Sequence, residues 1–478
     1  MEHEFSDIEY DAMLSRLFSR FPSFQNQGAQ AYKPGLERVE QMCRLIGESR
    51  AAEGMPAVAP HRAWPCIHVA GTNGKGSTCN MLAAALSSCG LKTGLYTSPH
   101  ILDFRERMRI VSNQGITLIS RRQVWDFIRR WTRELDDLDL SFFEITTVMA
   151  FDFFAREGVD AAVIETGLGG RLDATNVVVP ELSVITNIGL DHTDLLGGTL
   201  PEIAFEKAGI IKEGVPVVVG ESGPETDPVF GRVALQRNAP LCFADKEAYA
   251  MGMAVGGQVP DGPASESLLS RLDLKGPYQE KNLRTALCAL AVLSGRRSSD
   301  GSVPDVEPTF AKADLLGEAS ADAIAHAARR CGFHGRWEKL CDNPATICDI
   351  GHNEHGLKYN FAQLEHLLDS GEYSDLVMVY GSVRDKDVDA VLRIIPRRAR
   401  IFFTNADNHR AMPAEEVRQR FEAIFSNPDN KAYPFVADAV EAAMEYCRGL
   451  VRPLLYIGGS TYIVSEAVAS LAAKTVLK

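Results

Sequence analysis

The chain has 478 residues, more than the roughly 100–200 of a typical domain, so we expect at least two domains. A hydrophobic content of 45% excludes a disordered chain, and a formal net charge of -13 argues against nucleic acid or an anionic membrane surface as a partner. Ten cysteines without a close CxxC pair, an N-terminus without a basic and apolar leader, and no long apolar run predict a cytoplasmic protein with reduced thiols.

The first predicted elements form a strand, loop, helix and strand between residues 66 and 98. The apolar strand 66–70 leads into a glycine-rich loop. An Ala/Leu-rich helix from Ser77 to Cys89 follows, and a strand at 93–98 completes a unit typical of a parallel βαβ crossover. We therefore expect an α/β fold whose mainly parallel sheet is covered on both faces. The further strands expected in this sheet are 161–164, 182–186 and 215–219.

The second half of the chain resumes the alternation of strands and helices after a polar interruption. A helix expected at 278–293 is followed by residues 294–304, whose glycine and serine content is typical of an exposed loop or linker. One more helix is expected at 322–330, so we place the domain boundary near residue 333. The strands expected beyond that boundary are 345–349, 375–380, 400–404 and 454–458.

The glycine-rich segment Gly71-Thr72-Asn73-Gly74-Lys75-Gly76-Ser77 predicts a phosphate-binding loop that holds ATP. Its glycines let the backbone turn tightly toward an anion, and the N-terminus of the next helix adds the positive end of its dipole. Lys75 would place a cation on the β- and γ-phosphates, and Ser77 would offer a hydroxyl to a phosphate or a metal. Gly76 separates these two residues, which departs from the general pattern. The alternative is a simple turn between strand and helix.

Motifs on either side of this loop extend along nearly the whole chain. His68-Val69-Ala70 precedes the loop and Thr97-Ser98-Pro99-His100 follows it. With these motifs the chain resembles the folylpolyglutamate synthase/dihydrofolate synthase family of the Mur ligase superfamily, in its bacterial bifunctional form. The other motifs similar to that family, in the family's order, are residues 165–176, 185–193, 206–212, 334–338, 349–353 and 380–387.

The resemblance implies two domains and an activity. Residues 1–332 would form an ATPase domain that also binds the pterin or folate, and residues 333–478 a Rossmann-like glutamate ligase domain. The implied reaction is ATP-driven amide formation, in which the carboxylate of dihydropteroate or a folate becomes an acyl phosphate and the amine of L-glutamate displaces phosphate. The implied partners are small molecules, namely ATP, L-glutamate and dihydropteroate or folate, and we expect a monomer.

The resemblance also implies two magnesium sites. Phosphoryl transfer to a carboxylate brings two anions together, so a metal ion is needed to neutralise charge, and Mg²⁺ prefers oxygen ligands. By resemblance, Ser98 and Glu165 bind one ion and His192 binds the second. Lys207 matches a lysine that is carbamylated in the family, which reverses its charge and adds oxygen ligands. From the residues alone, a cap at Ser98, a turn contact at Glu165 and a solvated helix lysine at Lys207 stay open.

Residues of the second half are implied to bind the nucleotide. Asp349 and His352 follow an expected strand, at the carboxyl end where open α/β sheets bind ligands, and the family uses such residues on ATP. Asn282 and Arg336 match the positions that contact adenine and phosphate in the family. A structural salt bridge or cap is the alternative for these two residues. The residues expected to take part in catalysis are Lys75, Lys207 and His352.

The pterin is expected near Phe142-Phe143-Glu144 and Asp173, which align with the dihydropteroate contacts of the family. An aromatic ring such as that of Phe143 could stack on the flat pterin, and the carboxylates of Glu144 and Asp173 could pair with its amino-pyrimidine edge. Phe142 and Phe143 alone are also typical of core residues. An anionic substrate tail would meet nearby arginines, although alternating arginines are also typical of an exposed strand. These arginines are Arg105, Arg107 and Arg109.

Three other classes of protein share part of this pattern with the folate ligase. A Mur ligase that acts on a nucleotide-linked UDP-muramoyl substrate shares the chemistry, but Gly76 and Ser98-Pro99-His100 favour the folate branch. A phosphate-loop NTPase switch would leave the motifs of the second half without a role. An inactive relative that only binds folate disagrees with the intact loop and metal candidates. The sequence leaves open which pterin is accepted and how many glutamates are added.

Overall fold

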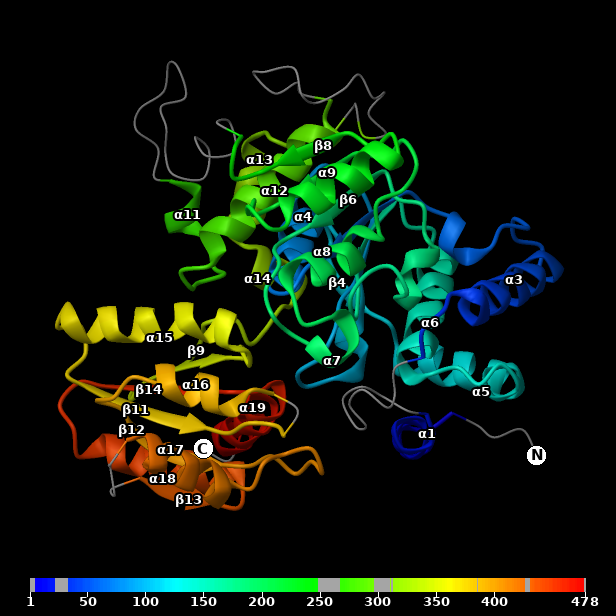
Figure 1. Cartoon of the computed structure of the whole chain (residues 1–478). Helices are drawn as coiled ribbons and strands as arrows, with labels where there is room; N and C mark the ends of the chain where they lie inside the picture. Colours follow the sequence, from blue (N-terminus) through cyan, green and yellow to red (C-terminus); the bar gives the residue numbers. More distant parts are fainter. Residues whose placement is uncertain are drawn as a thin grey trace. The chain divides into compact units, whose positions relative to one another are not determined.

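The computed structural model divides into two compact units (Figure 1). The first unit comprises Met1–His100, Phe104–Asp273 and Gln279–Phe333, and the second comprises Ile101–Asp103, Leu274–Tyr278 and His334–Lys478. The linker expected at 294–304 lies outside the described residues from residue 296 onward. The residues that the structure describes are 5–21, 33–247, 267–295, 310, 313–384, 386–425 and 430–476.

An eight-stranded sheet forms the centre of the first unit, in the order β4-β3-β2-β5-β1-β6-β7-β8. Six strands run parallel, and β3 and β4 add an antiparallel edge beside β2. The expectation of a mainly parallel sheet is therefore confirmed, and the antiparallel edge was not predicted. The strands are β1 (Cys66–Ala70), β2 (Thr93–Tyr96), β3 (Met108–Ser112), β4 (Gly115–Leu118), β5 (Ala161–Glu165), β6 (Leu182–Ile185), β7 (Val217–Val219) and β8 (Leu241–Phe243).

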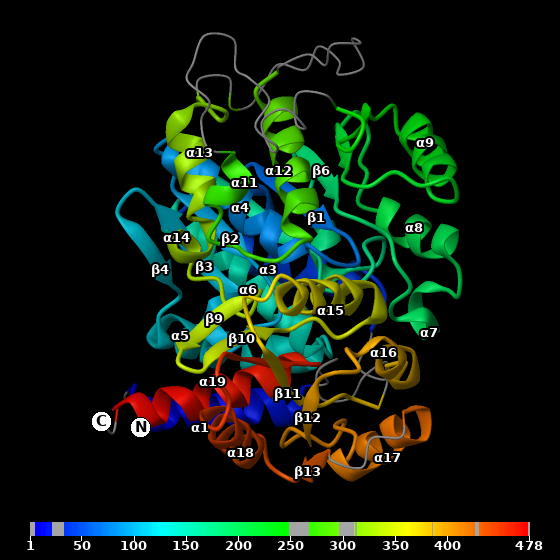
Figure 2. The same cartoon turned by 90° about the vertical axis from the view of Figure 1, so that its left-hand side faces the viewer.

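Helices cover both faces of this sheet (Figures 1 and 2). On one face, α4 (Lys75–Ser88) lies against the strands and packs on α12 (Gln279–Leu293), α13 (Glu318–Ala325) and α14 (Ala327–Cys331), so that nearly every residue of α4 is buried. On the other face, α6 (Phe142–Glu157) contacts β2 and β3 and packs on α3 (Glu37–Ala52) and α5 (Arg121–Asp137). A buried central sheet of Val, Ile and Ala residues is what a parallel arrangement requires.

Two expected helices differ in detail from those observed. The helix expected from Ser77 begins at Lys75, because Gly74 takes a left-handed conformation and starts the helix two residues earlier. The single helix expected at 322–330 is two short helices that meet at His326. The remaining elements of the first unit are α1 (Asp7–Arg20), η2 (Pro60–Arg62), η3 (Phe104–Arg107), η4 (Ala174–Val177), α7 (Thr193–Leu196), α8 (Leu200–Ala208), α9 (Asp227–Gln236) and α11 (Leu268–Arg271).

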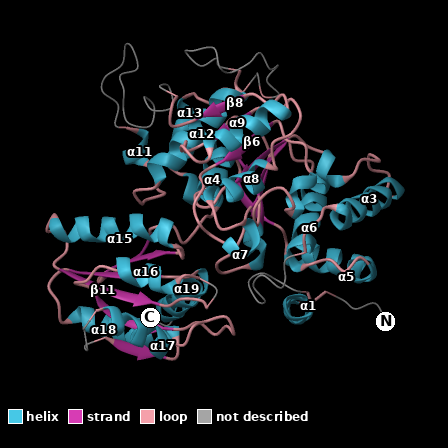
Figure 3. Cartoon of the chain, in the orientation of Figure 1, coloured by secondary structure: helices cyan, strands magenta, loops and turns pink. Residues whose placement is uncertain are grey.

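The second unit contains a six-stranded sheet in the order β13-β12-β11-β14-β10-β9 (Figure 3). Five strands are parallel and β9 is antiparallel to β10. The four expected strands are present, and the two edge strands β9 and β13 were not predicted. The strands are β9 (Glu338–Asp342), β10 (Ala345–Asp349), β11 (Asp375–Tyr380), β12 (Arg400–Thr404), β13 (Lys431–Tyr433) and β14 (Pro453–Gly458).

Two hydrophobic cores sandwich the second sheet, because successive side chains of a strand point to opposite faces. In β11, Met378 and Tyr380 face the core formed with α15 (Glu354–Asp369), α16 (Val388–Ile394) and α17 (Ala414–Ile424). Val377 and Val379 face the core formed with α18 (Val436–Arg448) and α19 (Thr461–Val476). All ten cysteines carry free thiols. Within the described ranges, no helix has the length and apolar character needed to cross a bilayer.

Candidate active site

The phosphate loop joins β1 to α4, and its glycines are required by close contacts. Gly71 has a φ of 150°, and a Cβ atom there would lie 1.8 Å from the hydroxyl oxygen of Thr186. Gly74 has a φ of 81°, and a Cβ atom there would lie 2.1 Å from Oδ1 of Asn282. Any side chain at either position would clash and strain the backbone. Asn282, an expected nucleotide contact, thus lies directly against the phosphate loop.

The first amides of the loop are held by the segment that follows β6. The Thr72 and Asn73 amides donate to the backbone carbonyl and the side-chain oxygen of Asn187, each at 2.9 Å. The Thr72 hydroxyl donates to the Gly189 carbonyl at 3.1 Å. These two amides therefore shape the loop, and the amides at the start of α4 are the ones placed at a helix N-terminus to receive phosphate. Cofactor binding by Thr72 and Asn73 stays a prediction.

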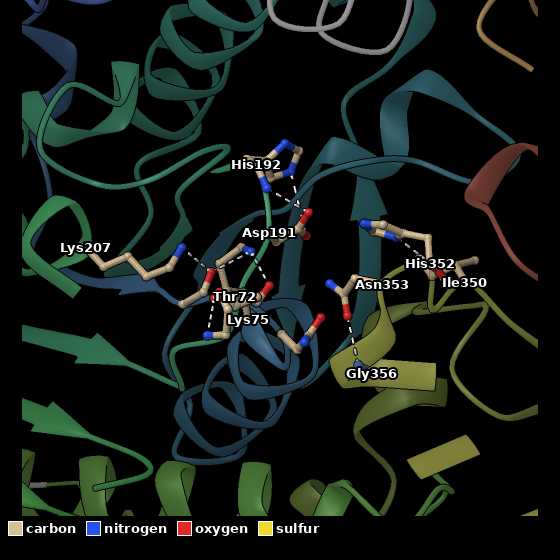
Figure 4. A network of polar contacts seen from close by, with 12 residues as sticks. Thr72, Lys75, Asp191, His192, Lys207, Ile350, His352, Asn353 and Gly356 are labelled. Carbon is tan, nitrogen blue, oxygen red and sulfur yellow. Dashed lines mark hydrogen bonds and ion pairs between the residues drawn. The ribbon is translucent and has the colours of Figure 1, made fainter. Parts of the chain in front are cut away.

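Two lysine amines converge on one backbone carbonyl of this loop (Figure 4). Lys75 Nζ donates to the Gly71 carbonyl at 3.0 Å and to the Thr72 carbonyl at 3.2 Å, and Lys207 Nζ donates to the same Gly71 carbonyl at 3.0 Å. Burial of Lys207, reinforced by the nearby Lys75 cation, lowers the Lys207 pKa to about 7. Neutral amine is therefore available near pH 7, and neutral amine is the form that adds CO₂. The carbamylation expected from the resemblance fits this environment.

Ser98 and Glu165 lie together at the carboxyl ends of β2 and β5. The Ser98 amide donates to Glu165 Oε2 at 3.1 Å, and the Glu165 side chain is buried. A Cβ atom at Gly76 would lie 3.7 Å from the same carboxylate oxygen, so the phosphate loop is adjacent. The structure thus brings the two expected ligands of the first metal ion to the loop. A hydroxyl and a carboxylate are oxygen donors that suit Mg²⁺.

His192 occupies a left-handed position before α7, with a φ of 51°. Its backbone amide donates to Asp191 Oδ1 at 2.9 Å, and its Nε2 lies 3.9 Å from Asp191 Oδ2 (Figure 4). Over the part of the chain that the structure describes, no group of three or more His, Cys, Asp or Glu side chains is placed to hold a metal ion. A metal site here would therefore need the Ser98 hydroxyl, phosphate oxygens or a carbamate as additional ligands.

Two residues that bond the phosphate loop or the start of α4 were missed from the sequence. Gln279, at the start of α12, donates through Nε2 to the Ser77 hydroxyl at 3.2 Å and accepts from Asn282 Nδ2 at 2.9 Å. Asn187 holds the loop amides, as described above. Gln279 stands three residues before Asn282, on the same face of a helix, and this spacing could have indicated it. Asn187 belongs to the motif at residues 185–193, one of those similar to the family.

In the second unit, the carboxylate of Asp349 is bonded at both oxygens. Oδ1 accepts from the Gly351 amide at 2.7 Å and from Asn360 Nδ2 at 2.8 Å. Oδ2 accepts from the Tyr278 hydroxyl at 2.6 Å and from the Trp337 amide at 2.9 Å. Four donors fill the usual acceptor positions of a carboxylate. A direct contact of Asp349 with ATP would have to displace one of them, and this role stays a prediction.

The turn after Asp349 carries His352, whereas Arg336 lies before β9. His352 Nδ1 lies 3.1 Å from the Ile350 carbonyl, and a carbonyl accepts only from a protonated nitrogen, which assigns the hydrogen to Nδ1 (Figure 4). Asn353 caps α15 by accepting from the Gly356 amide at 2.8 Å. Arg336 is close enough to Tyr278 to oppose the effect of burial, which raises the pKa of that hydroxyl.

The two expected pterin-binding carboxylates also have internal partners. Glu144 Oε2 accepts from the Ser141 amide at 2.7 Å and Oε1 accepts from Arg38 Nε at 2.9 Å, so this carboxylate completes the capping box of α6. Asp173 Oδ2 accepts from the Leu168 amide at 2.8 Å, and Oδ1 from the amide and hydroxyl of Thr175. Pterin binding by these carboxylates stays a prediction.

Phe143 packs against the backbone of the loop after β5. A Cβ atom at Gly167 would lie 2.4 Å from the ring carbon Cζ of Phe143, so a side chain there would displace the ring. The Tyr96 ring lies 6.0 Å from the Phe143 ring, centroid to centroid. The Phe143 carbonyl accepts the hydroxyls of Thr146 and Thr147, each at 2.9 Å. Phe143 is therefore held both by its backbone and by its ring, as a rigid stacking surface requires.

The alternative that the arginines lie on an exposed strand is wrong for Arg107 and Arg109, which are both buried. Arg109, on β3, donates to the Cys331 and Gly332 carbonyls at 2.7 and 3.0 Å, and to the Thr97 hydroxyl at 2.6 Å. Arg107 donates to His100 Nδ1 at 2.8 Å, and its guanidinium lies 5.3 Å from the centre of the Phe142 ring. Arg109 thus ties α14 to the sheet, because three carbonyl and hydroxyl acceptors occupy its guanidinium.

Comparison with known families and proteins places the chain among ligases. Residues 69–219 match the Mur ligase middle domain, and residues 335–454 match the Mur ligase glutamate ligase domain. A dihydrofolate synthase/folylpolyglutamate synthase of Bacillus subtilis is 30% identical over 91% of this chain and 94% of its own length. A probable bifunctional folylpolyglutamate synthase/dihydropteroate synthase of Haloferax volcanii is 32% identical over 91% of this chain, which spans 48% of that longer protein.

Solved structures of similar chains contain nucleotides and substrates. Mycobacterium tuberculosis folylpolyglutamate synthase, complexed with ADP and AMPPCP, matches with a TM-score of 0.75 at 28% identity over 98% of this chain and 99% of that one. E. coli FolC in complex with DHPP and ADP matches with a TM-score of 0.72 at 27% identity, over 98% of each chain. A bifunctional folylpolyglutamate synthase/dihydrofolate synthase with Mn, AMPPNP and L-glutamate bound also has a TM-score of 0.72 at 27% identity, over 97% of this chain and 98% of that one.

Proposed function

Since this chain belongs to the folylpolyglutamate synthase/dihydrofolate synthase family, we propose that it is an ATP-dependent ligase that joins L-glutamate to a pterin carboxylate. The acceptor would be dihydropteroate, a folate that already carries glutamate, or both. The observation that supports this most is the contact between Ser98 and Glu165 beside the phosphate loop. It provides oxygen donors for Mg²⁺ next to the place where the loop would hold the phosphates of ATP.

The reaction proceeds in two displacements. First, a carboxylate oxygen of the pterin substrate attacks the γ-phosphorus of ATP, the bond to the bridging oxygen of ADP breaks, and an acyl phosphate forms. Second, the neutral amine of L-glutamate attacks the carbonyl carbon, the carbon–oxygen bond to phosphate breaks, and inorganic phosphate leaves. The amine loses one proton to solvent or to phosphate. Both steps depend on holding the reactants in one geometry, which can contribute about 7–11 kcal/mol.

Residues of the first unit supply the charges that the first step needs. Lys75 is at the start of α4, where its amine can exchange the Gly71 carbonyl for a phosphate oxygen. Ser98 and Glu165 would hold one Mg²⁺, and His192 with carbamylated Lys207 would hold a second. When bound, Mg²⁺ neutralises charge on the phosphate oxygens. Asn282 and Gln279 border the loop from α12 and would fix the nucleotide.

Residues of the second unit are proposed to complete nucleotide binding. Asp349 fixes the turn that carries His352, through the Gly351 amide. With the hydrogen on Nδ1, His352 Nε2 is the acceptor nitrogen of the ring and can accept a hydrogen bond from a bound group. Arg336 would contribute a guanidinium to a phosphate. We further propose that the protein acts as a monomer in the cytoplasm, and sedimentation analysis would measure its oligomeric state.

A direct assay tests the proposed function. Purified protein is incubated with Mg-ATP and labelled L-glutamate, and either dihydropteroate or tetrahydrofolate is offered as the acceptor. We expect ATP-dependent incorporation of label into at least one acceptor, with one ADP formed for each amide bond. A UDP-muramoyl acceptor serves as the comparison substrate. Incorporation into neither pterin, or ATP hydrolysis at an equal rate without glutamate, would contradict the proposal.

A further inference from the structure

A chain of three polar side chains crosses the buried interior of the first unit next to β1. His68 is the central residue of β1 and is fully buried. Its Nε2 lies 2.8 Å from the hydroxyl oxygen of Thr175, and that hydroxyl lies 2.5 Å from Asp173 Oδ1. Thr175 belongs to η4, and Asp173 caps it. Side chains from a strand and from a distant loop are thus joined by two hydrogen bonds in the core.

The direction of these hydrogen bonds follows from the number of protons. A threonine hydroxyl has one hydrogen, which Thr175 donates to the Asp173 carboxylate, so the hydroxyl can only accept from His68. The His68 ring therefore carries its hydrogen on Nε2. Burial lowers the pKa of His68 to about 3, which keeps the ring neutral. Nδ1 of the same ring is buried and has no hydrogen-bond partner among the described residues, where the bond to Thr175 is the one that the ring makes.

Asp173 in turn holds the loop that follows β5. Its Oδ2 accepts from the Leu168 amide at 2.8 Å, and its own amide donates to the Gly170 carbonyl at 3.2 Å. The backbone of this loop supports the Phe143 ring at Gly167. The loop starts directly after Glu165, the expected metal ligand at the end of β5. A shift of Asp173 would therefore move the surface on which Phe143 rests.

Burying a histidine in the middle of a sheet is costly. Neighbouring positions of β1 hold Ile67 and Val69, and an apolar residue would fill position 68 without leaving a ring nitrogen unpaired. Histidine differs from an apolar residue because its ring N–H can donate a hydrogen bond to the buried Thr175 hydroxyl. Because Asp173 uses both its oxygens on the loop and on Thr175, its orientation depends on that hydroxyl.

We propose that His68 is a positioning residue for the pterin substrate, acting through Thr175 and Asp173 on the loop that supports Phe143. This inference rests on the proposed function, because it assigns the residue to one substrate of that reaction. It concerns the pterin and not the nucleotide, since the chain of hydrogen bonds ends at residues 167–170 and not at the phosphate loop. His68 touches neither substrate itself and acts only by fixing the residues beyond it.

The test compares two variants of His68 in the full-length protein. His68→Leu removes the donor, and we expect KM for the accepted pterin to rise about tenfold, the loss typical of one hydrogen bond. The Kd for AMPPNP should stay within about twofold of wild type, because the phosphate loop is not part of the chain of bonds. His68→Gln is the matched control, since its amide nitrogen can donate to Thr175, and it should restore most of the lost affinity. A purely structural role would lower Tm without this split between pterin and nucleotide.

A second pair of variants covers the case in which His68→Leu fails to fold. Thr175→Val removes the hydroxyl at constant volume, and Thr175→Ser retains it, so only the former should raise the pterin KM. The double variant His68→Leu/Thr175→Val should show the KM of the worse single variant, because both substitutions break the same series of hydrogen bonds. Multiplied effects of about a hundredfold would overturn the inference, as would equal changes in pterin KM and AMPPNP Kd. If wild-type protein joins glutamate to neither pterin, the proposed function fails first and the inference falls with it.

Discussion

In each unit a polar turn follows the carboxyl end of a central parallel strand. The two turns differ in whether their charged side chains have partners within the protein. After β1, the amines of Lys75 and Lys207 share one carbonyl, and burial, reinforced by the like charge of Lys75, depresses the pKa of Lys207. After β10, the carboxylate of Asp349 accepts from four donors. Within the described residues the two amines of the first turn form no ion pair, and a lysine with a perturbed pKa is common at ligand sites, whereas the second turn is internally satisfied. Position at a strand end therefore does not by itself distinguish a binding residue from a structural one.

The largest expected effect is at Lys75. Lys75→Ala removes a charge from the phosphate loop, and we expect kcat/KM of glutamate ligation to fall by about 10²–10³-fold with Tm nearly unchanged. Steady-state kinetics and a thermal melt measure the two quantities. Lys246→Ala is the control, because Lys246 is an exposed lysine paired with Asp227. Full activity of Lys75→Ala would show that the amine in the turn after β1 does not serve the ligand. The difference between this turn and the satisfied turn at Asp349 would then have no functional meaning.

Asp349→Asn tests the satisfied turn. The substitution replaces one acceptor oxygen by a donor that opposes at least one existing donor, so we expect the second unit to lose about 2–3 kcal/mol of stability. Hydrogen exchange at the amides of β10 and α15 reports this local stability. Asp375→Asn is the control, since among the described residues the Asp375 carboxylate accepts a single side-chain hydrogen bond, from the neighbouring Ser374 hydroxyl. Weaker AMPPNP binding at unchanged stability would instead assign Asp349 to the nucleotide.

The pH dependence of the free energy of unfolding tests the lowered pKa of Lys207. In the folded protein the Lys207 pKa is about 7, against an ordinary value of 10.5, so the unfolded chain binds more protons between these values. The free energy of unfolding should therefore rise with pH above 7, by up to about 1.4 kcal/mol per pH unit from this group. Urea titrations at pH 7, 8 and 9 in CO₂-free buffer measure the slope. Lys207→Met should lose this contribution to the slope, whereas Lys246→Met should keep it. Equal slopes for Lys207→Met and the wild type would show that the pKa of Lys207 is not the cause.

The smallest effect is expected at Glu144. Glu144→Gln keeps an acceptor for the Ser141 amide, since glutamine also completes a capping box, but removes the charge that pairs with Arg38. We expect a loss of about 0.5–1 kcal/mol in stability and an unchanged KM for the pterin. A tenfold increase in KM at wild-type stability would show that this carboxylate serves the substrate as well as the helix. Arg38→Gln should reproduce the loss of stability if the ion pair is its cause.

Local patterns in the sequence predicted most of the regular structure. The strand 66–70, the loop and the following helix were predicted because apolar periodicity and glycines are adjacent in the chain. The edge strands β9 and β13 were missed, since short edge strands have little apolar pattern. The antiparallel edge of the first sheet was missed for a different reason. Its pairing with β2 depends on the path of the chain, which the pattern of β3 does not contain.

Local patterns in the sequence could not predict the hydrogen-bond partners of the candidate site residues. Lys207 and Gly71 are 136 positions apart, and Tyr278 and Asp349 are 71 positions apart, so no spacing rule connects them. The family motifs indicated which residues matter, but they did not indicate that Asp173 and Asp349 are already bonded. Whether a carboxylate faces a ligand or the protein depends on donors brought close by the fold.

The contact between Gly74 and Asn282 limits how this loop can change during evolution. A methyl group at position 74 would overlap the amide of Asn282, and a smaller residue at 282 would relieve only that overlap. The left-handed backbone at Gly74 would still disfavour any substitution. Single changes at 74 therefore meet two barriers, and the paired change removes just one. We therefore expect glycine to persist at position 74 among homologues, because both the contact with Asn282 and the left-handed backbone require it.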